Sequence, residues 1–149
     1  MTIPVVVPPE AKLTLQIHGN SLPQLFENTA RELLKTFIDP EDVSPVLREK
    51  LVVEGADTGA LLKGWVEALL NLVYNQHILF KAFRFQEFEA ERTGAGKLRA
   101  EVTGELLDPL RHTFRKGPPR WRCAEVHLLN NSKTIEAQIL LESGRAEQK

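Results

Sequence analysis

The chain has 149 residues, of which 42% are hydrophobic and 26% charged, and its formal net charge is -1 at pH 7. This length and composition predict one globular domain over residues 1–149, and the near-neutral charge argues against a strongly basic nucleic-acid-binding protein. The single cysteine excludes an intrachain disulfide, and no apolar run approaches the ~18 residues of a membrane span. We therefore expect a cytoplasmic protein with no membrane contact.

The first half of the sequence contains one structural unit twice. Residues 1–9 are rich in proline and are expected to be extended, and residues 11–19 alternate as a half-buried strand does. After Gly19, Ser21 can cap a helix that has one apolar stripe. The same order of strand, glycine, cap and apolar helix returns 36 positions later. There Gly55 corresponds to Gly19, and Asp57, more readily a helix cap than a metal ligand, corresponds to Ser21.

The second half of the sequence predicts strands. Residues 79–92 favour a long strand with a bulge near Gln86–Glu87, because Phe88 is out of phase with the preceding phenylalanines. Residues 97–106 alternate, residues 107–119 indicate a loop, and residues 120–129 and 134–142 flank the hairpin sequence NNSK. The order β-α-β-α-β-β-β-β predicts an α+β fold, with an antiparallel-rich mixed sheet and two helices packed on it. Residues 144–149 are expected to form a loose tail.

Three stretches, taken together, resemble the archease family. They are VEGADTGALLKGWVEALLNLVYNQHILFKAF at 53–83, GELLDPLRH at 104–112 and WRCAEVHLL at 121–129. The last strand, EAQILLES at 136–143, is similar to the family's C-terminal strand. The order and spacing of these motifs carry the resemblance, which covers about residues 10–143.

The resemblance implies a small partner protein and not an enzyme. Archeases activate the RNA-splicing ligase that joins 2′,3′-cyclic-phosphate or 3′-phosphate ends to 5′-hydroxyl ends, in tRNA splicing and RNA repair. GTP and manganese belong to that ligase, while the family's own divalent cation, such as calcium, is held by a pair of carboxylates. We expect a monomer or weak homo-oligomer.

The sequence departs from the family at that carboxylate pair. The N-terminal His-Thr-Ala-Asp motif falls on residues 9–12, so that Lys12 stands where the family has aspartate, and the C-terminal aspartate is replaced by Glu142. We therefore predict no cofactor in this chain, with Glu142 and Glu10 kept as candidate metal ligands. Both Lys12 and Glu142 fall on the polar side of their strands, so we expect the Lys12 ammonium within ion-pair reach of Glu142.

Further candidate contacts to a partner or to RNA lie in and beyond the basic loop 111–122. Asp108 and His112 have two interpretations. They could belong to a loop that contacts phosphate or a partner, or they could form an Asp-Pro turn with an exposed histidine. His127 reads as a contact residue or as a structural histidine bonded to a loop carbonyl. Arg111 and Arg122 are the basic candidates, although a solvated loop would have the same composition.

Two other functions remain open on the sequence alone. One is a small RNA-processing enzyme with His112 or His127 as general acid–base and Arg122 holding phosphate. The other is a binding module that keeps only the archease scaffold. No Walker A, G-x-G-x-x-G or H-E-x-x-H pattern occurs in the sequence. The sequence therefore predicts neither a nucleotide-binding site nor a zinc site for any of these functions.

Overall fold

The computed structural model describes residues 12–36, 38–90, 95–108, 110, 112, 121–130 and 134–143. The expected extended segment 1–9 and tail 144–149 lie outside these residues. The helices are α1 (Leu22–Lys35), the short 3-10 helix η1 (Pro40–Asp42) and α2 (Thr58–Asn75). The strands are β1 (Lys12–Gly19), β2 (Leu47–Gly55), β3 (Ile78–Glu89), β4 (Gly96–Leu106), β5 (Trp121–Asn130) and β6 (Ile135–Ser143).

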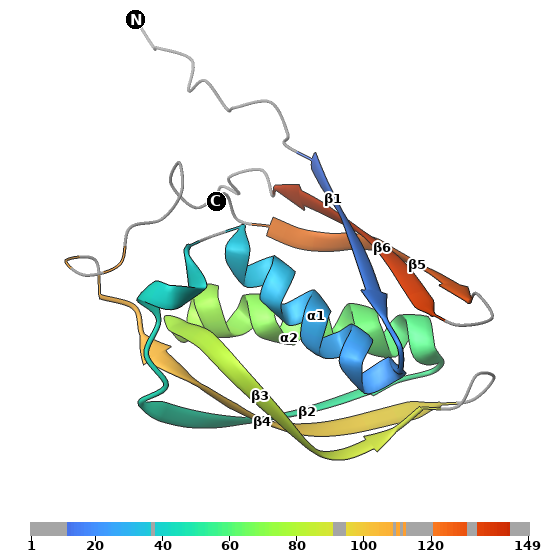
Figure 1. Ribbon diagram of the computed structural model, residues 1–149, viewed down its shortest axis with the longest axis horizontal. Helices are drawn as coiled ribbons and strands as arrows, with labels where there is room; N and C mark the ends of the chain where they lie inside the picture. The colour runs from blue at the N-terminus through green and yellow to red at the C-terminus, as the bar shows by residue number, and fades with distance from the viewer. Residues whose placement is uncertain are drawn as a thin grey trace, which may run out of the picture.

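The predicted α+β class, with two long helices and antiparallel strands, is confirmed. The strands form two three-stranded sheets, β1-β6-β5 and β2-β4-β3, and every pairing among the described residues is antiparallel. The two long helices lie between the sheets (Figure 1), with α1 packed on β1 and α2 on β2 and β5. The two strand–helix units therefore contribute to two different sheets and do not share one.

The repeated glycine has a steric cause. A Cβ on Gly19 would lie 2.6 Å from the backbone nitrogen of Leu25, and one on Gly55 would lie 2.4 Å from that of Leu61. In both units the first turn of the helix thus packs directly on the end of its strand, where only glycine leaves room. The predicted caps are confirmed: the side chain of Ser21 accepts a hydrogen bond from Gln24 N, and that of Asp57 accepts one from Ala60 N.

The core is a cluster of aliphatic and aromatic side chains between the two sheets. The predicted bulge is present, as a register shift between Phe85 and Glu87. This shift lets Phe88 reach the Phe26 ring, with the centroids 5.0 Å apart. Trp65 is fully buried and contacts the rings of Phe26, Phe83 and Phe85. A further register shift in β3, between Phe80 and Ala82, was not predicted.

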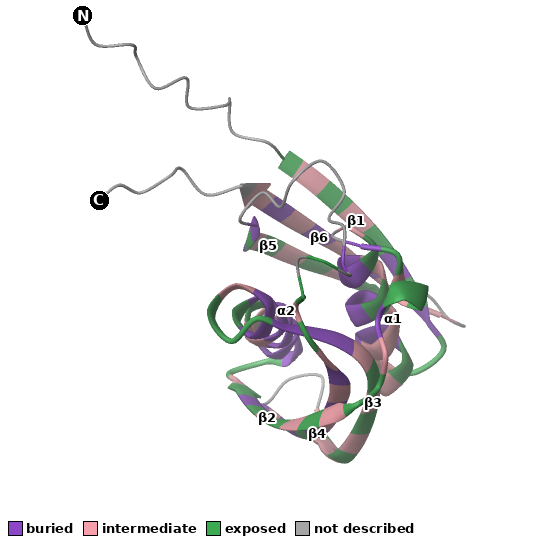
Figure 2. Cartoon of the chain, turned by 90° about the vertical axis from the view of Figure 1, so that its left-hand side faces the viewer, coloured by how far each residue is buried: buried purple, intermediate pink, exposed green. Residues whose placement is uncertain are grey.

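The face of sheet β1-β6-β5 that points away from the helices is mostly polar, with Leu140 and the exposed Leu129 among its polar side chains. Along β6, Ala137, Ile139 and Leu141 are buried, whereas the residues between them are partly exposed. Figure 2 shows the same alternation as coloured bands along β1, β5 and β6. Within the described ranges, no helix has the length and apolar character needed to cross a membrane.

Candidate functional site

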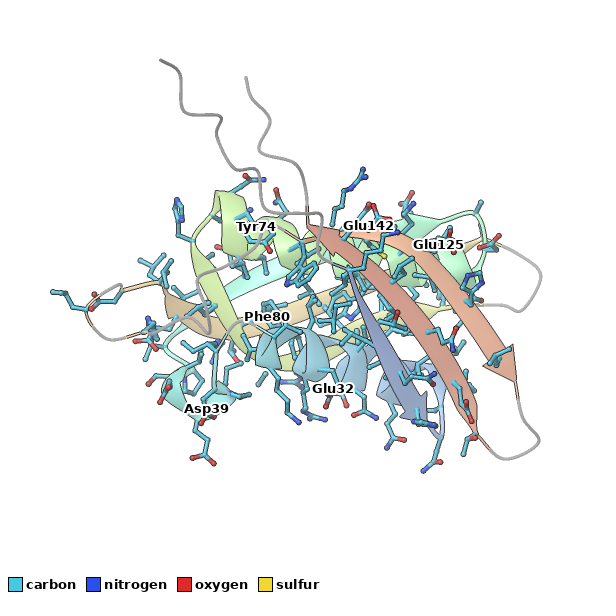
Figure 3. The ribbon with its side chains drawn as sticks, turned by 90° about the horizontal axis from the view of Figure 1, so that it is seen from above. Glu32, Asp39, Tyr74, Phe80, Glu125 and Glu142 are labelled. Atoms are coloured by element: carbon cyan, nitrogen blue, oxygen red, sulfur yellow. The ribbon has the colours of Figure 1, made fainter. Side chains whose placement is uncertain are left out.

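Three charged residues form one row at the end of sheet β1-β6-β5. The register places Lys12 directly opposite Glu142, and Glu142 directly opposite Arg122 on its other side. The three side chains therefore lie side by side on the outward face. Glu142 and Glu125, labelled in Figure 3, come from the neighbouring strands β6 and β5.

The ion pair in this row is made by Arg122. Its Nη2 donates a hydrogen bond to Glu142 Oε1 at 3.1 Å, with 69% of the arginine side chain and 21% of the glutamate side chain exposed. The expected ion pair between Lys12 and Glu142 is not formed among the described residues, although the two face each other. Arg122 lies opposite Glu142 on the other neighbouring strand, so it competes with Lys12 for the same carboxylate. Its planar guanidinium also suits a carboxylate better than an ammonium does.

Two histidine–glutamate pairs lie further along the same face. His127 Nε2 lies 2.9 Å from Glu125 Oε1, and His18 Nε2 lies 3.7 Å from Glu136 Oε2. His127 is 62% exposed, so the interpretation of it as a structural histidine bonded to a loop carbonyl is wrong. A bulge between Cys123 and Glu125 brings Glu125 onto the same face as Arg122.

His112 is an internal part of the structure and not an exposed loop residue. Its Nδ1 accepts a hydrogen bond from Asp108 N at 2.9 Å, which leaves the proton on Nε2, 3.1 Å from Glu105 Oε1. The His112 side chain is fully buried, so the interpretation of it as an exposed histidine is wrong. Asp108 Oδ1 accepts from Leu110 N, as an Asp turn does.

Glu105, which the sequence analysis did not single out, connects this turn to the chain after α1. Its Oε1 accepts a hydrogen bond from Ser44 N at 2.8 Å, as well as contacting His112. The nearby Leu107 N donates to His77 O, and His77 has a positive φ of 58°. The carboxylate thus anchors two loops at the end of β4, a role with no local sequence signal because Ser44 is 61 residues away.

Two candidate residues fall on parts of the chain that are not described. Glu10, the second candidate metal ligand, and Arg111 in the basic loop both lie outside the described residues. Of the loop 111–122, the structure describes His112, Trp121 and Arg122. The described part of the candidate site is therefore the row of Lys12, Glu142 and Arg122, with the histidine–glutamate pairs beside it.

A family model and individual relatives of known sequence agree on one family for this chain. The Archease protein family (MTH1598/TM1083) matches residues 6–118. The chain is 31% identical over 132 residues to a protein archease of Methanosarcina acetivorans, covering 89% of this chain and 90% of that protein. It is 32% identical over 103 residues to a protein archease of Pyrococcus abyssi, covering 68% and 70% of the two chains. The chain belongs to the archease family.

A solved structure supports the fold of this archease. The solution structure of Methanobacterium thermoautotrophicum protein 1598 matches with a TM-score of 0.69 and 20% sequence identity, covering 89% of this chain and 92% of that chain. At this identity the likeness concerns the arrangement of the helices and sheets. It agrees with the two-sheet architecture described above.

The row at the end of β1-β6-β5 does not fit the divalent cation that the archease resemblance implied. Calcium takes six to eight oxygen ligands, largely from carboxylates. Here Glu142 already holds a guanidinium, and Lys12 brings a second positive charge to the position of the other carboxylate. No group of three or more His, Cys, Asp or Glu side chains that could hold a metal occurs among the residues described.

Cys123 is buried behind this row. It pairs in register with Leu141 on the inward side of the sheet. Burial raises the pKa of its thiol to about 11, and Glu67 contributes in the same direction. A thiol with this pKa is protonated near neutral pH, so Cys123 has the properties of a packing residue and not those of a nucleophile.

Proposed function

We propose that this archease is a non-catalytic partner protein that stimulates an RNA-splicing ligase by contact, in tRNA splicing or RNA repair. The family membership, carried by a relative matched over nine-tenths of both chains, is the observation that supports it most directly. GTP and manganese would then belong to the ligase. The arrangement of the described histidines is a second, independent support.

An enzyme of this size would need a general acid–base within hydrogen-bond reach of its substrate. The ring of His112 is fully buried and both of its nitrogens are engaged within the protein. His127 is accessible, but it lies on an open sheet face, and the side chain of its partner Glu125 is exposed to the same extent. Neither arrangement encloses a substrate, which favours action through contact over the enzyme alternative.

The contact surface that we propose is the basic loop 111–122 together with the outward face of β5. The side chain of Arg122 is 69% exposed, and His127 lies on the same strand face. Arg111 belongs to the same proposal by sequence. A surface of this charge would meet RNA phosphates or acidic side chains of the ligase, and either contact should weaken with salt.

A pull-down from native lysate tests the proposal. The immobilised archease should retain the ligase activity of the same organism, and the isolated archease should neither join nor cleave RNA. The Arg122→Glu variant should retain less ligase, whereas Arg84→Glu on sheet β2-β4-β3 should retain the wild-type amount. RNA-joining or RNA-cleaving activity in the isolated chain that His127→Ala abolishes would contradict the proposal in favour of an enzyme.

A further inference from the structure

The row of Lys12, Glu142 and Arg122 has unbalanced charge. One carboxylate lies between two permanent cations, each directly opposite it on a neighbouring strand. Side chains in directly opposite positions have Cβ atoms about 4.5–5.5 Å apart, so both cations can reach the carboxylate. The row therefore carries a net positive charge of one without any bound ion.

The guanidinium is already in contact with the carboxylate. A free dication would have to displace the Arg122 Nη2 from Glu142 Oε1 and approach against the charge of Lys12. The guanidinium is tethered to β5, so its local concentration is fixed by the chain and is not lowered by dilution. A free ion in millimolar or lower amounts is at a disadvantage against such a tethered cation.

The other sheet offers a comparison within the same molecule. Lys50, Glu101 and Arg84 repeat the order Lys–Glu–Arg across β2-β4-β3, with Glu101 again in the middle. No ion pair within 4 Å joins these three side chains in the described part of the chain. Each row has a carboxylate in the next same-face position along its arginine-bearing strand, Glu87 on β3 and Glu125 on β5. The rows differ because Glu87 lies 3.8 Å from Arg99, whereas Glu125 contacts the imidazole of His127.

We infer that Arg122, supported by Lys12, is the permanent cation of Glu142, so that this end of the sheet is positively charged without a metal. The inference concerns the chain alone and does not depend on the ligase. It predicts that removing both side-chain cations creates a calcium site. In the Lys12→Asp/Arg122→Gln variant two carboxylates would face each other across β1 and β6, and a cation would relieve their repulsion.

Calorimetric titration with calcium chloride tests the inference, with thermal unfolding in calcium and in EDTA as a second readout. The wild-type protein should show no stoichiometric binding and the same Tm in both solutions. The Lys12→Asp/Arg122→Gln variant should bind one calcium and unfold at a higher temperature with it. Adding Glu142→Gln to that variant should abolish both effects.

The matched control is Lys50→Asp/Arg84→Gln, which makes the same exchange around Glu101. Because Arg48 flanks that row and Arg99 engages the carboxylate of Glu87 beside it, its calcium affinity should be lower by about tenfold or more. Equal affinities would overturn the inference, because any such row would then make a site. Stoichiometric, Glu142-dependent calcium binding by the wild-type protein would overturn it as well, as would a folded double variant that does not respond to calcium.

Discussion

The indole nitrogen of Trp65 donates a hydrogen bond to the carbonyl oxygen of Phe26 at 2.9 Å, and so joins the helices of the two repeated units inside the core. Both residues are fully buried. Each helix has one apolar face that must be buried, and the two units bury these faces against each other. The hydrogen bond fixes the relative position of the two helices. It also gives a direct test of the core.

Trp65→Phe should lower the free energy of unfolding by about 2 kcal/mol, because it removes this hydrogen bond and leaves a cavity. Chemical denaturation monitored by circular dichroism measures the change. Trp121→Phe is the matched control, because Nε1 of Trp121 is buried without a hydrogen-bond partner within the structure described here. Trp121→Phe should lower the free energy of unfolding by less than Trp65→Phe does. Equal losses would show that the Trp65 hydrogen bond contributes nothing measurable.

Gly19→Ala and Gly55→Ala should each destabilise the protein by more than ~1 kcal/mol, because the added Cβ meets helix backbone that cannot move aside. The control is Gly59→Ala, where the nearest atom is Asp57 Oδ1 at 3.5 Å and the residue lies in α2. Alanine is the better helix former, so Gly59→Ala should be neutral or stabilising by up to ~1 kcal/mol. Destabilisation of the same size at all three positions would refute the steric account of the repeat.

His112→Ala should lower the free energy of unfolding by roughly 1–3 kcal/mol, because Asp108 N loses its acceptor inside the protein. His127→Ala should change it by no more than ~0.5 kcal/mol, since that side chain and its partner Glu125 are exposed. Urea titrations of the two variants measure both values. A larger effect at His127 than at His112 would contradict the assignment of His112 as the structural histidine.

The stability of the protein should depend on Cys123 at high pH. Burial raises the pKa of the folded thiol from its ordinary value of 9.0 to about 11, so the unfolded chain ionises first as pH rises. The contribution of the thiol is fully present below pH 9 and is lost between pH 9 and 11. The wild-type protein should lose more stability than Cys123→Ala between pH 8 and pH 10.5, and parallel pH profiles would contradict the raised pKa.

Local patterns were enough to predict most of the fold. The caps at Ser21 and Asp57, the bulge before Phe88 and the hairpin of β5 and β6 each depend on a few neighbouring residues, and all are present. The division into two sheets could not be predicted in this way. It depends on β1 pairing with β6 at the other end of the chain, and nothing local to either strand specifies that partner.

The candidate site was also predicted in part, because local patterns place side chains on a strand face but do not specify their partners on distant strands. Alternation placed Lys12 and Glu142 on the polar faces of their strands, and the structure places them directly opposite each other. The partner of Glu142 was misjudged because the pairing of β5 with β6 brings Arg122 to its other side. Burial of His112 was also missed, because its partner Glu105 is itself anchored by the distant Ser44 N.

The most direct test of the proposed function is a turnover measurement on the RNA-splicing ligase of the same organism. The substrate would be an RNA with 2′,3′-cyclic-phosphate and 5′-hydroxyl ends, supplied in excess over the ligase with GTP and manganese. We predict that the archease raises the number of joining events per ligase molecule, and that the archease alone joins no RNA. Unchanged ligase turnover at saturating archease, or joining by the archease without the ligase, would contradict the account.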